Sequence, residues 1–144
     1  MMEKIVVDTS IIIDGEITKL IEAGSLKDCE IIIPVAVLDE LQSQASRSKE
    51  YGFVGLEESK KIRQISEKHN ITLRFEGERP SMEDIRLASH GRIDAIIKDI
   101  AKKNNATFYT ADYVQALVAE AEGVKTSYSK PDVKTTNLEF ERFF

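Results

Sequence analysis

Residues 6–15 read VVDTSIIIDG, with two aspartates, Asp8 and Asp14, on either side of an apolar run. The preceding residues and Asp8 itself, EKIVVD at 3–8, have the β-branched, apolar character of a short buried strand that ends in a polar turn. Asp8 therefore stands at the end of the first predicted strand. Asp14 precedes GEITKLIEAG (15–24), where apolar residues recur at helical spacing, so its simplest role is the N-cap of that helix. We expect the isoleucines between the aspartates to be core.

Short apolar strands and amphipathic helices alternate along the rest of the chain. Further strands are predicted at EIIIP (30–34), ITLRF (71–75), ATFYT (106–110) and VKTSYS (124–129). Helices are predicted at residues 35–45, 56–70, 81–105 with a break near Gly91, and 111–123. The glycine-containing stretch SRSKEYGFVG (46–55) is predicted to be a loop or broken turn. This alternation favours an α/β fold with a parallel sheet covered by helices on both faces.

Composition narrows the class of protein. The chain has 144 residues, 42% hydrophobic and 31% charged, which fits a single globular domain. A net charge of −5 argues against a purely electrostatic binder of nucleic acid. No apolar run approaches the roughly 20 residues that a membrane span needs, and no signal peptide is recognisable. With one cysteine, the chain cannot form an internal disulfide, and we expect a cytoplasmic protein.

Acidic residues follow the predicted strands. In open parallel sheets, binding sites form at the carboxyl ends of the strands. Four segments each offer one acid to that edge, namely Asp8, Glu40, Asp94 and Asp112. Clustered carboxylates repel one another, and a divalent cation removes the repulsion. Oxygen ligands favour Mg²⁺ or Mn²⁺, which suits metal-assisted hydrolysis of a phosphodiester.

Each of these acids also has an ordinary structural alternative. The chain has 25 acidic residues, so several will fall near strand ends by chance. Asp94 and Asp112 could each cap the helix that follows. Asp39 neighbours Glu40, but successive helical residues point about 100° apart, so only one of the two can face the site. Glu40 is favoured because the apolar side of its helix includes Val37 and Leu41.

Several stretches together resemble the PIN domain nucleases. They are VVDTSIIID (6–14), IPVAVLDEL (33–41) and RIDAIIKDIAKKNNATFYTAD (92–112). The resemblance implies a three-layer α/β/α sandwich with a central parallel sheet over residues 1–130, and a C-terminal extension or linker at 131–144. It also implies an endoribonuclease that needs Mg²⁺ or Mn²⁺ and hydrolyses single-stranded RNA.

Carried over by position, the resemblance makes all four acids catalytic. Asp8, Asp94 and Asp112 are the predicted metal-binding residues, with Asp8 and Asp94 as the strongest candidates for direct ligands. Glu40 and Asp112 would act directly or through water, positioning the nucleophile or a second ion. We expect this cluster to be the centre of the site.

Hydroxyl and basic residues complete the predicted site. Ser10 and Thr110 match positions where a hydroxyl commonly holds an acid or a water in place. Basic residues near the acids are candidates to guide the RNA backbone, although such residues most often form a solvated helix face. The candidates are Arg47, Lys49, Lys60 and Arg92.

The resemblance also implies partners. DTSIIIDG (8–15) with GFVGLEESKKI (52–62) looks most like the PIN domain fused to an ATPase and an RNA-binding KH domain in archaea. The chain has no phosphate-binding loop of the ATPase type, so it is either a stand-alone relative or part of a longer protein. Stand-alone PIN domains are often toxins paired with an antitoxin. We expect an RNA substrate and a homodimer, with an antitoxin or fused ATPase and KH domains as possible partners and no membrane.

Two other functions stay open. One is a weakly active or inactive PIN fold that serves as an RNA-binding or oligomerisation module. The other is a phosphatase with Asp8 as nucleophile, which is less favoured because Ser10 stands where the D-x-D-x-T motif needs its second aspartate.

Overall fold

The computed structural model describes residues 2–79, 81–86 and 92–131. Within them, five strands form one parallel sheet in the order β3-β2-β1-β4-β5. The strands are β1 (Glu3–Val7), β2 (Cys29–Pro34), β3 (Thr72–Glu76), β4 (Thr107–Thr110) and β5 (Thr126–Tyr128). The predicted α/β class with a central parallel sheet is confirmed.

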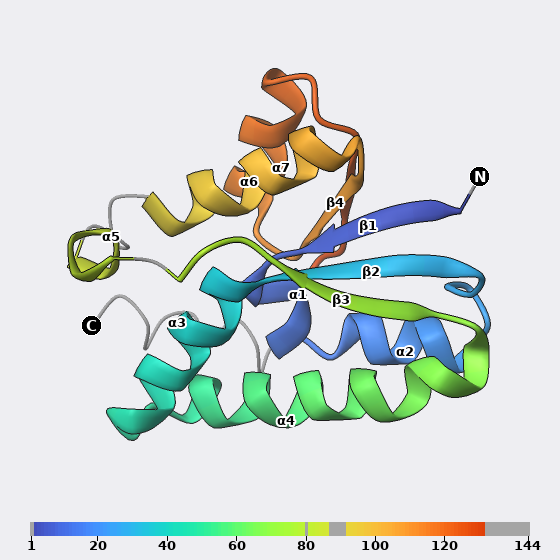
Figure 1. Cartoon of the computed structure of the whole chain (residues 1–144), viewed down its shortest axis with the longest axis horizontal. Helices are drawn as coiled ribbons and strands as arrows, with labels where there is room; N and C mark the ends of the chain where they lie inside the picture. The colour runs from blue at the N-terminus through green and yellow to red at the C-terminus, as the bar shows by residue number, and fades with distance from the viewer. Residues whose placement is uncertain (1, 80, 87–91, 132–144) are drawn as a thin grey trace.

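Helices lie on both faces of this sheet (Figure 1). The helices are α1 (Thr9–Ile13), α2 (Glu16–Glu22), α3 (Val35–Ser46), α4 (Glu50–Ser66), α5 (Met82–Arg86), α6 (Arg92–Asn104) and α7 (Tyr113–Ala121), with a 3₁₀ turn, η1 (Glu67–His69), after α4. In Figure 1, α6 and α7 lie above the sheet, and α2 and α4 lie below it. The result is three layers, with β1 in the middle strand position.

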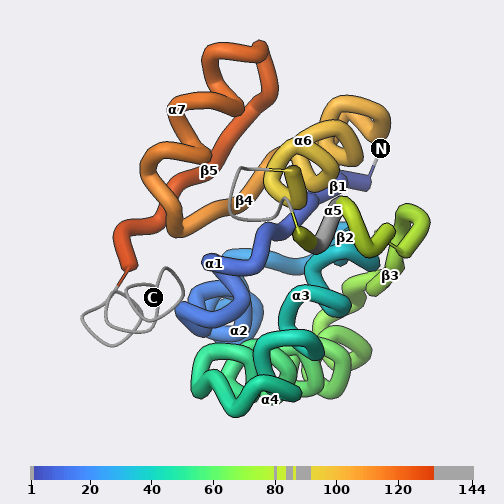
Figure 2. Tube along the Cα trace, turned by 90° about the vertical axis from the view of Figure 1, so that its left-hand side faces the viewer, coloured from blue at the N-terminus to red at the C-terminus, as the bar shows by residue number. Residues whose placement is uncertain are grey.

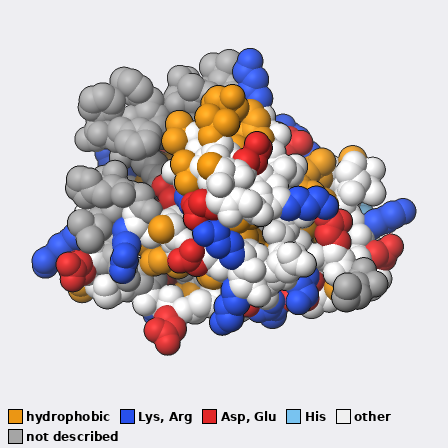
Figure 3. Space-filling model, turned by 90° about the horizontal axis from the view of Figure 1, so that it is seen from above, with side chains coloured by type: hydrophobic (Ala, Val, Ile, Leu, Met, Phe, Trp, Pro, Cys, Tyr) orange, Lys and Arg blue, Asp and Glu red, His pale blue; other side chains and the backbone are white. Residues whose placement is uncertain are grey.

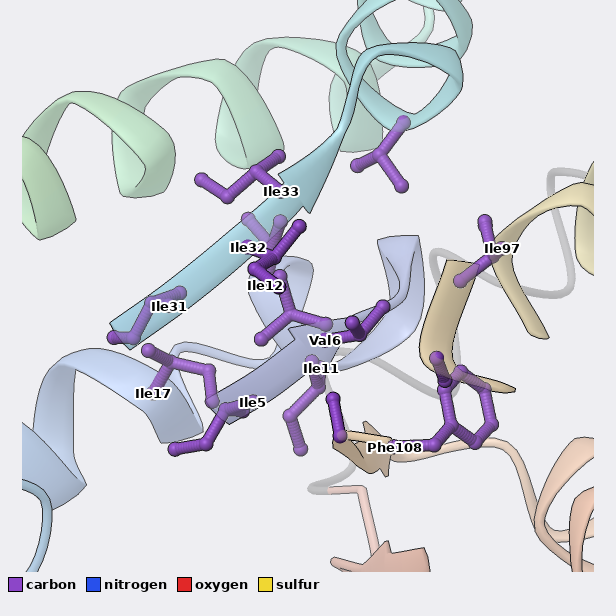
Figure 4. Packing of buried hydrophobic residues seen from close by; sticks show 14 of the residues in the cluster. Ile5, Val6, Ile11, Ile12, Ile17, Ile31, Ile32, Ile33, Ile97 and Phe108 are labelled. Atoms are coloured by element: carbon purple, nitrogen blue, oxygen red, sulfur yellow. The ribbon is translucent and has the colours of Figure 1, made fainter. Parts of the chain in front are cut away.

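The core is built mainly from isoleucine and valine, because strands buried on both faces favour β-branched side chains. Ile5, Val6 and Ile31 to Ile33 are fully buried in the two central strands. Ile11 and Ile12 of α1 pack into the same cluster (Figure 4). The prediction that the isoleucines between Asp8 and Asp14 are core is therefore confirmed.

The predicted loop at residues 46–55 is wrong in its second half, because α4 begins at Glu50. The glycines in this stretch allow a close helix crossing instead of breaking the helix. A Cβ on Gly52 would lie 2.3 Å from the backbone nitrogen of Ala45, and one on Gly55 would lie 2.3 Å from a methyl carbon of Leu41. Both glycines are buried where α4 packs against α3.

The N-cap prediction for Asp14 is also wrong. Asp14 is the C-cap of α1, with αR backbone geometry and its own N–H bonded to the carbonyl oxygens of Ser10 and Ile12. The N-cap of α2 is Gly15, which adopts φ +77° and has no side chain to make a cap hydrogen bond. Pattern reasoning missed the short helix α1, whose residues are all buried and therefore show no helical alternation of apolar and polar positions.

Some predictions fall on residues that are not described. The extension predicted at 131–144 lies, apart from Pro131, outside the described residues, as does the helix break near Gly91. No helix in the described part of the chain has the length and apolar character of a membrane span.

Figure 3, seen from the α6 and α7 side, shows a gathering of hydrophobic side chains on the surface. Exposed apolar residues of α7 and β5 are Tyr113, Val114, Leu117, Val118 and Tyr128.

Candidate active site

The carboxyl edge of the sheet brings together segments that are far apart in the sequence. Figure 2 looks onto this edge and shows α1, α3, α6 and α7 around the centre of the view. Each of these helices directly follows, or lies against, one of the three central strands. The acids predicted for the site lie on or just before these helices, near their N-terminal ends or, for Glu40, further along α3.

Asp8 occupies the centre of this arrangement. It follows the last residue of β1, and it is the N-cap of α1, accepting a hydrogen bond from the Ile11 backbone N–H at 3.2 Å. Two hydroxyls hold its carboxylate: Ser10 Oγ donates to Oδ1 and Thr110 Oγ1 donates to Oδ2, each at 2.6 Å. We call these two residues the hydroxyl pair. Both oxygens of Asp8 are thereby fixed in orientation.

The hydroxyl pair is itself held by backbone donors. Ser10 Oγ accepts from the Ala111 N–H at 2.9 Å, and Thr110 Oγ1 accepts from the Asp112 N–H at 3.0 Å. The two hydroxyl oxygens are 3.2 Å apart. The strand β4 and the turn after it therefore determine where the Asp8 carboxylate points.

Burial makes Asp8 an unusual carboxyl group. Only 3% of the residue is exposed. Burial raises the pKa of Asp8 from 3.8 to about 6, and the hydrogen bonds from Ser10, Thr110 and Ile11 oppose this rise without cancelling it. The nearby charge of Asp94 raises the pKa further. The structure thus brings two of the predicted acids within electrostatic reach of each other.

Asp94 lies in the first turn of α6 and is half-buried. It is the third residue of the helix, so it is not the residue at the N-cap position. Its Oδ2 accepts a hydrogen bond from Gln115 Nε2 at 3.1 Å. Gln115 Oε1 in turn accepts from Lys98 Nζ at 2.5 Å. Sequence reasoning singled out neither contact.

A signal for both missed residues was present in the helical spacing. Lys98 follows Asp94 by four positions on α6, and Gln115 follows Asp112 by three on α7. Residues three or four apart share a helix face, so polar residues at these distances from a candidate acid are the ones to examine.

Asp112 is the N-cap of α7. Its Oδ1 accepts hydrogen bonds from the backbone N–H groups of Val114 at 3.0 Å and Gln115 at 3.2 Å. The helix-capping role that the sequence left open for Asp112 is therefore confirmed. Both cap bonds end on Oδ1, so capping does not use Oδ2 and does not exclude a second role for this carboxylate.

Glu40 lies on the inner side of α3. The residue is 9% exposed, and its helix contacts both α1 and α6. The neighbouring Asp39 instead pairs with Arg79, its Oδ1 lying 2.5 Å from Arg79 Nη1. Of these two adjacent acids, Glu40 is the one turned toward the interior.

The predicted basic residues are distributed over different parts of the surface. Lys60 is exposed on α4, and Arg92 is exposed at the start of α6, on the opposite side of the sheet. Arg47 and Lys49 lie in the short connection between α3 and α4. These four side chains do not share one helix face.

A divalent cation fits the chemistry of the donors at this edge. In the described part of the chain, no group of three or more acidic, histidine or cysteine side chains is close enough together to hold a metal ion. Mg²⁺ needs only one or two protein carboxylates, with water and substrate completing its shell. The mutual repulsion of Asp8 and Asp94 is the kind of interaction that a cation between them relieves.

Comparison with known proteins places this architecture. The family profile described as PIN domain matches residues 5–121, which is most of the chain. The chain belongs to the PIN domain family. Members of this family are usually nucleases, and they generally use divalent metal ions.

Two comparisons each match this PIN domain over most of its length to a protein from Methanocaldococcus jannaschii. An uncharacterised KH and PIN-domain containing protein is 42% identical over 142 residues, which is 99% of this chain and 22% of the relative. This PIN domain therefore spans about a fifth of the curated relative. A solved domain of a functionally unknown protein superimposes with a TM-score of 0.85 at 44% identity, covering 90% of this chain and 93% of that domain.

Proposed function

We propose that this PIN domain is an endoribonuclease that hydrolyses phosphodiester bonds of single-stranded RNA with Mg²⁺ or Mn²⁺. The observation that carries the proposal is the Asp8 carboxylate, buried at the carboxyl edge, held by two hydroxyls and facing the charge of Asp94. Burying one carboxylate beside a second one is unfavourable, and a bound cation would offset that cost.

In this proposal, Asp8 and Asp94 are the direct metal ligands, and Glu40 and Asp112 act directly or through water. A bound divalent ion activates a water and neutralises charge on the attacked phosphate. The hydroxyl pair keeps both Asp8 oxygens in one orientation, so the ligand geometry is set before the ion arrives. The α7 cap gives Asp112 a fixed position beside the same strand end.

RNA binding and assembly belong to the same proposal. Basic side chains would contact the phosphates of the substrate, and the candidates, which lie on different parts of the surface, are Arg47, Lys49, Lys60 and Arg92. The fusion to KH domains in the M. jannaschii relative supports RNA as the substrate. A homodimer, fused ATPase and KH domains, a cytoplasmic location, and a domain boundary near residue 130 remain predictions, and an antitoxin is the alternative partner for a stand-alone chain.

The test is cleavage of a fluorescent single-stranded RNA with Mn²⁺, with EDTA in place of Mn²⁺, and by the Asp8→Asn variant. We expect cleavage only by the wild type with Mn²⁺. Asp99→Asn is the matched control, because it makes the same chemical change on an exposed residue of α6. Equal cleavage by wild type and Asp8→Asn would reject the proposed function.

The other two functions give different results in the same experiment. An inactive RNA-binding module would retain RNA in a gel-shift assay and leave it intact with Mn²⁺. A phosphatase would release phosphate from a small phosphoester and leave the RNA intact.

A further inference from the structure

Lys98, a buried lysine close to the acids, has no part in the function proposed above. Lys98 lies on α6 and is only 6% exposed. Lysines are almost never this buried unless a partner satisfies them. The partner here is an uncharged amide, since Lys98 Nζ donates to Gln115 Oε1 at 2.5 Å. Lys98 also lies within electrostatic reach of Glu122, yet its hydrogen bond goes to the uncharged amide, and that choice of partner needs an explanation.

The explanation lies at the other end of the same amide. Gln115 Nε2 donates to Asp94 Oδ2 at 3.1 Å. A lysine ammonium group can only donate hydrogen bonds, and an ionised carboxylate can only accept them. An amide between the two satisfies both in one orientation alone, with its oxygen toward Lys98 and its nitrogen toward Asp94. Lys98 and Asp94 therefore favour the same orientation of the Gln115 amide, and Lys98 anchors the amide oxygen.

Gln115 also contacts the fourth acid. Its backbone N–H donates to Asp112 Oδ1 at 3.2 Å. One residue thus bonds to Asp94 on α6 through its side chain and to Asp112 at the start of α7 through its main chain. Gln115 therefore connects α6 to the start of α7 at these two acids.

We propose that the Gln115 side chain is a positioning group that holds Asp94 for the divalent cation, and that Lys98 acts through Gln115 by anchoring its amide. The proposal rests on the metal-dependent function above and adds two residues to it. Neither residue touches the metal. Without Lys98 the amide oxygen loses its donor, so the side chain that holds Asp94 is less firmly anchored.

The test is calorimetric titration of the metal-free protein with Mn²⁺ alone. Gln115→Met keeps the length of the side chain and removes its two side-chain hydrogen bonds, while the main-chain bond to Asp112 remains. We expect its Mn²⁺ affinity to fall by about tenfold, the lower end of what loss of an outer-shell partner costs. Gln64→Met, an exposed glutamine on α4, is the matched control and should bind as the wild type does. Gln115→Ala replaces Gln115→Met if circular dichroism shows that the latter has not folded.

Lys98→Met separates positioning from simple charge. Removing a positive charge near an acidic site would tighten cation binding if Lys98 acted through space, whereas loss of the anchor on the Gln115 amide weakens it. We expect weaker binding in the wild-type background and no further weakening in the Gln115→Met background, because the two residues act in series. Equal weakening in both backgrounds, tighter binding by Lys98→Met, or unchanged binding by Gln115→Met would each overturn the proposal.

The same titrations distinguish the two proposals. If the wild type binds Mn²⁺ and the variants weaken it in this pattern while no RNA is cut, the positioning role stands and the ribonuclease proposal fails. If the wild type cuts RNA and the variants bind Mn²⁺ as it does, only the positioning role fails. If the wild type binds no Mn²⁺, both fail.

Discussion

Neutralising Asp8 should stabilise the metal-free protein. The pKa of Asp8 is raised from 3.8 to about 6, so the folded protein holds this proton more tightly than the unfolded chain does. As pH rises, the unfolded chain loses the proton near 3.8 and the folded protein loses it only near 6. Stability therefore falls between these two values and stays low above them. At about 1.4 kcal/mol per pH unit, the full loss is about 3 kcal/mol.

Asparagine at position 8 avoids this loss and fits the same contacts. Its oxygen can keep the hydrogen bonds from Ser10 and the Ile11 N–H, and its nitrogen can donate to Thr110 Oγ1, which then donates to Ser10 Oγ at the present separation of 3.2 Å. Allowing about 1 kcal/mol for this rearrangement, we expect Asp8→Asn to be more stable than the wild type by about 2 kcal/mol at pH 7.5. The stability advantage of Asp8→Asn over the wild type should fall to zero or become negative as the pH is lowered from 6 to 4.

The assay is urea unfolding in EDTA at several pH values between 4 and 7.5. Asp99→Asn, on the exposed side of α6, should change the unfolding free energy by less than about 0.5 kcal/mol. An Asp8→Asn protein that is no more stable than the wild type at pH 7.5 would refute the reasoning, since it would mean that the folded protein favours the ionised carboxylate.

Three further predictions concern metal, packing and RNA. Mn²⁺ at about 100 times its dissociation constant should raise the unfolding free energy of the wild type by about 2.7 kcal/mol and leave Asp8→Asn unchanged in a urea titration. Gly52→Ala should destabilise the protein by about 1–3 kcal/mol or more in the same assay, because its methyl group would overlap the Ala45 backbone; a change below 0.5 kcal/mol would contradict the close crossing. Lys49→Gln with Lys60→Gln should weaken RNA binding and lower its salt dependence in fluorescence anisotropy, and unchanged salt dependence would remove these residues from the RNA path.

The sequence predicted the sheet well because its strands are short, apolar and β-branched. It placed Asp8, Asp94 and Asp112 at a strand end or near the start of a helix and Glu40 further along its helix, and it preferred Glu40 over Asp39, which the structure pairs with Arg79. The sequence-based prediction failed where one local feature is compatible with two different structures. In the sequence, Gly52 is typical of a helix break, whereas in the fold its lack of a side chain lets α3 pack closely against α4.

The contacts of Asp94 could not be predicted either, and the physical reason is different. Gln115 meets Asp94 across 21 positions, and the position of α6 relative to α7 decides which side chains meet. A pattern within one helix predicts which face a residue occupies but not what lies opposite. The two roles of Asp8, as helix cap and as the buried acid of the edge, likewise depend on the unpredicted helix α1.

The hydroxyl pair links the site to the order in which the chain is synthesised. Thr110 reaches Asp8 Oδ2 across 102 positions, so this second carboxylate oxygen is held only after β4 has paired with β1. This contact is among the longest-range in the domain, and long-range pairing forms late because it closes a large loop. A growing chain that stops before β4 lacks Thr110 and Asp112. Under the proposed ribonuclease function, the acidic site therefore stays incomplete during synthesis until β4 and the start of α7 have been made.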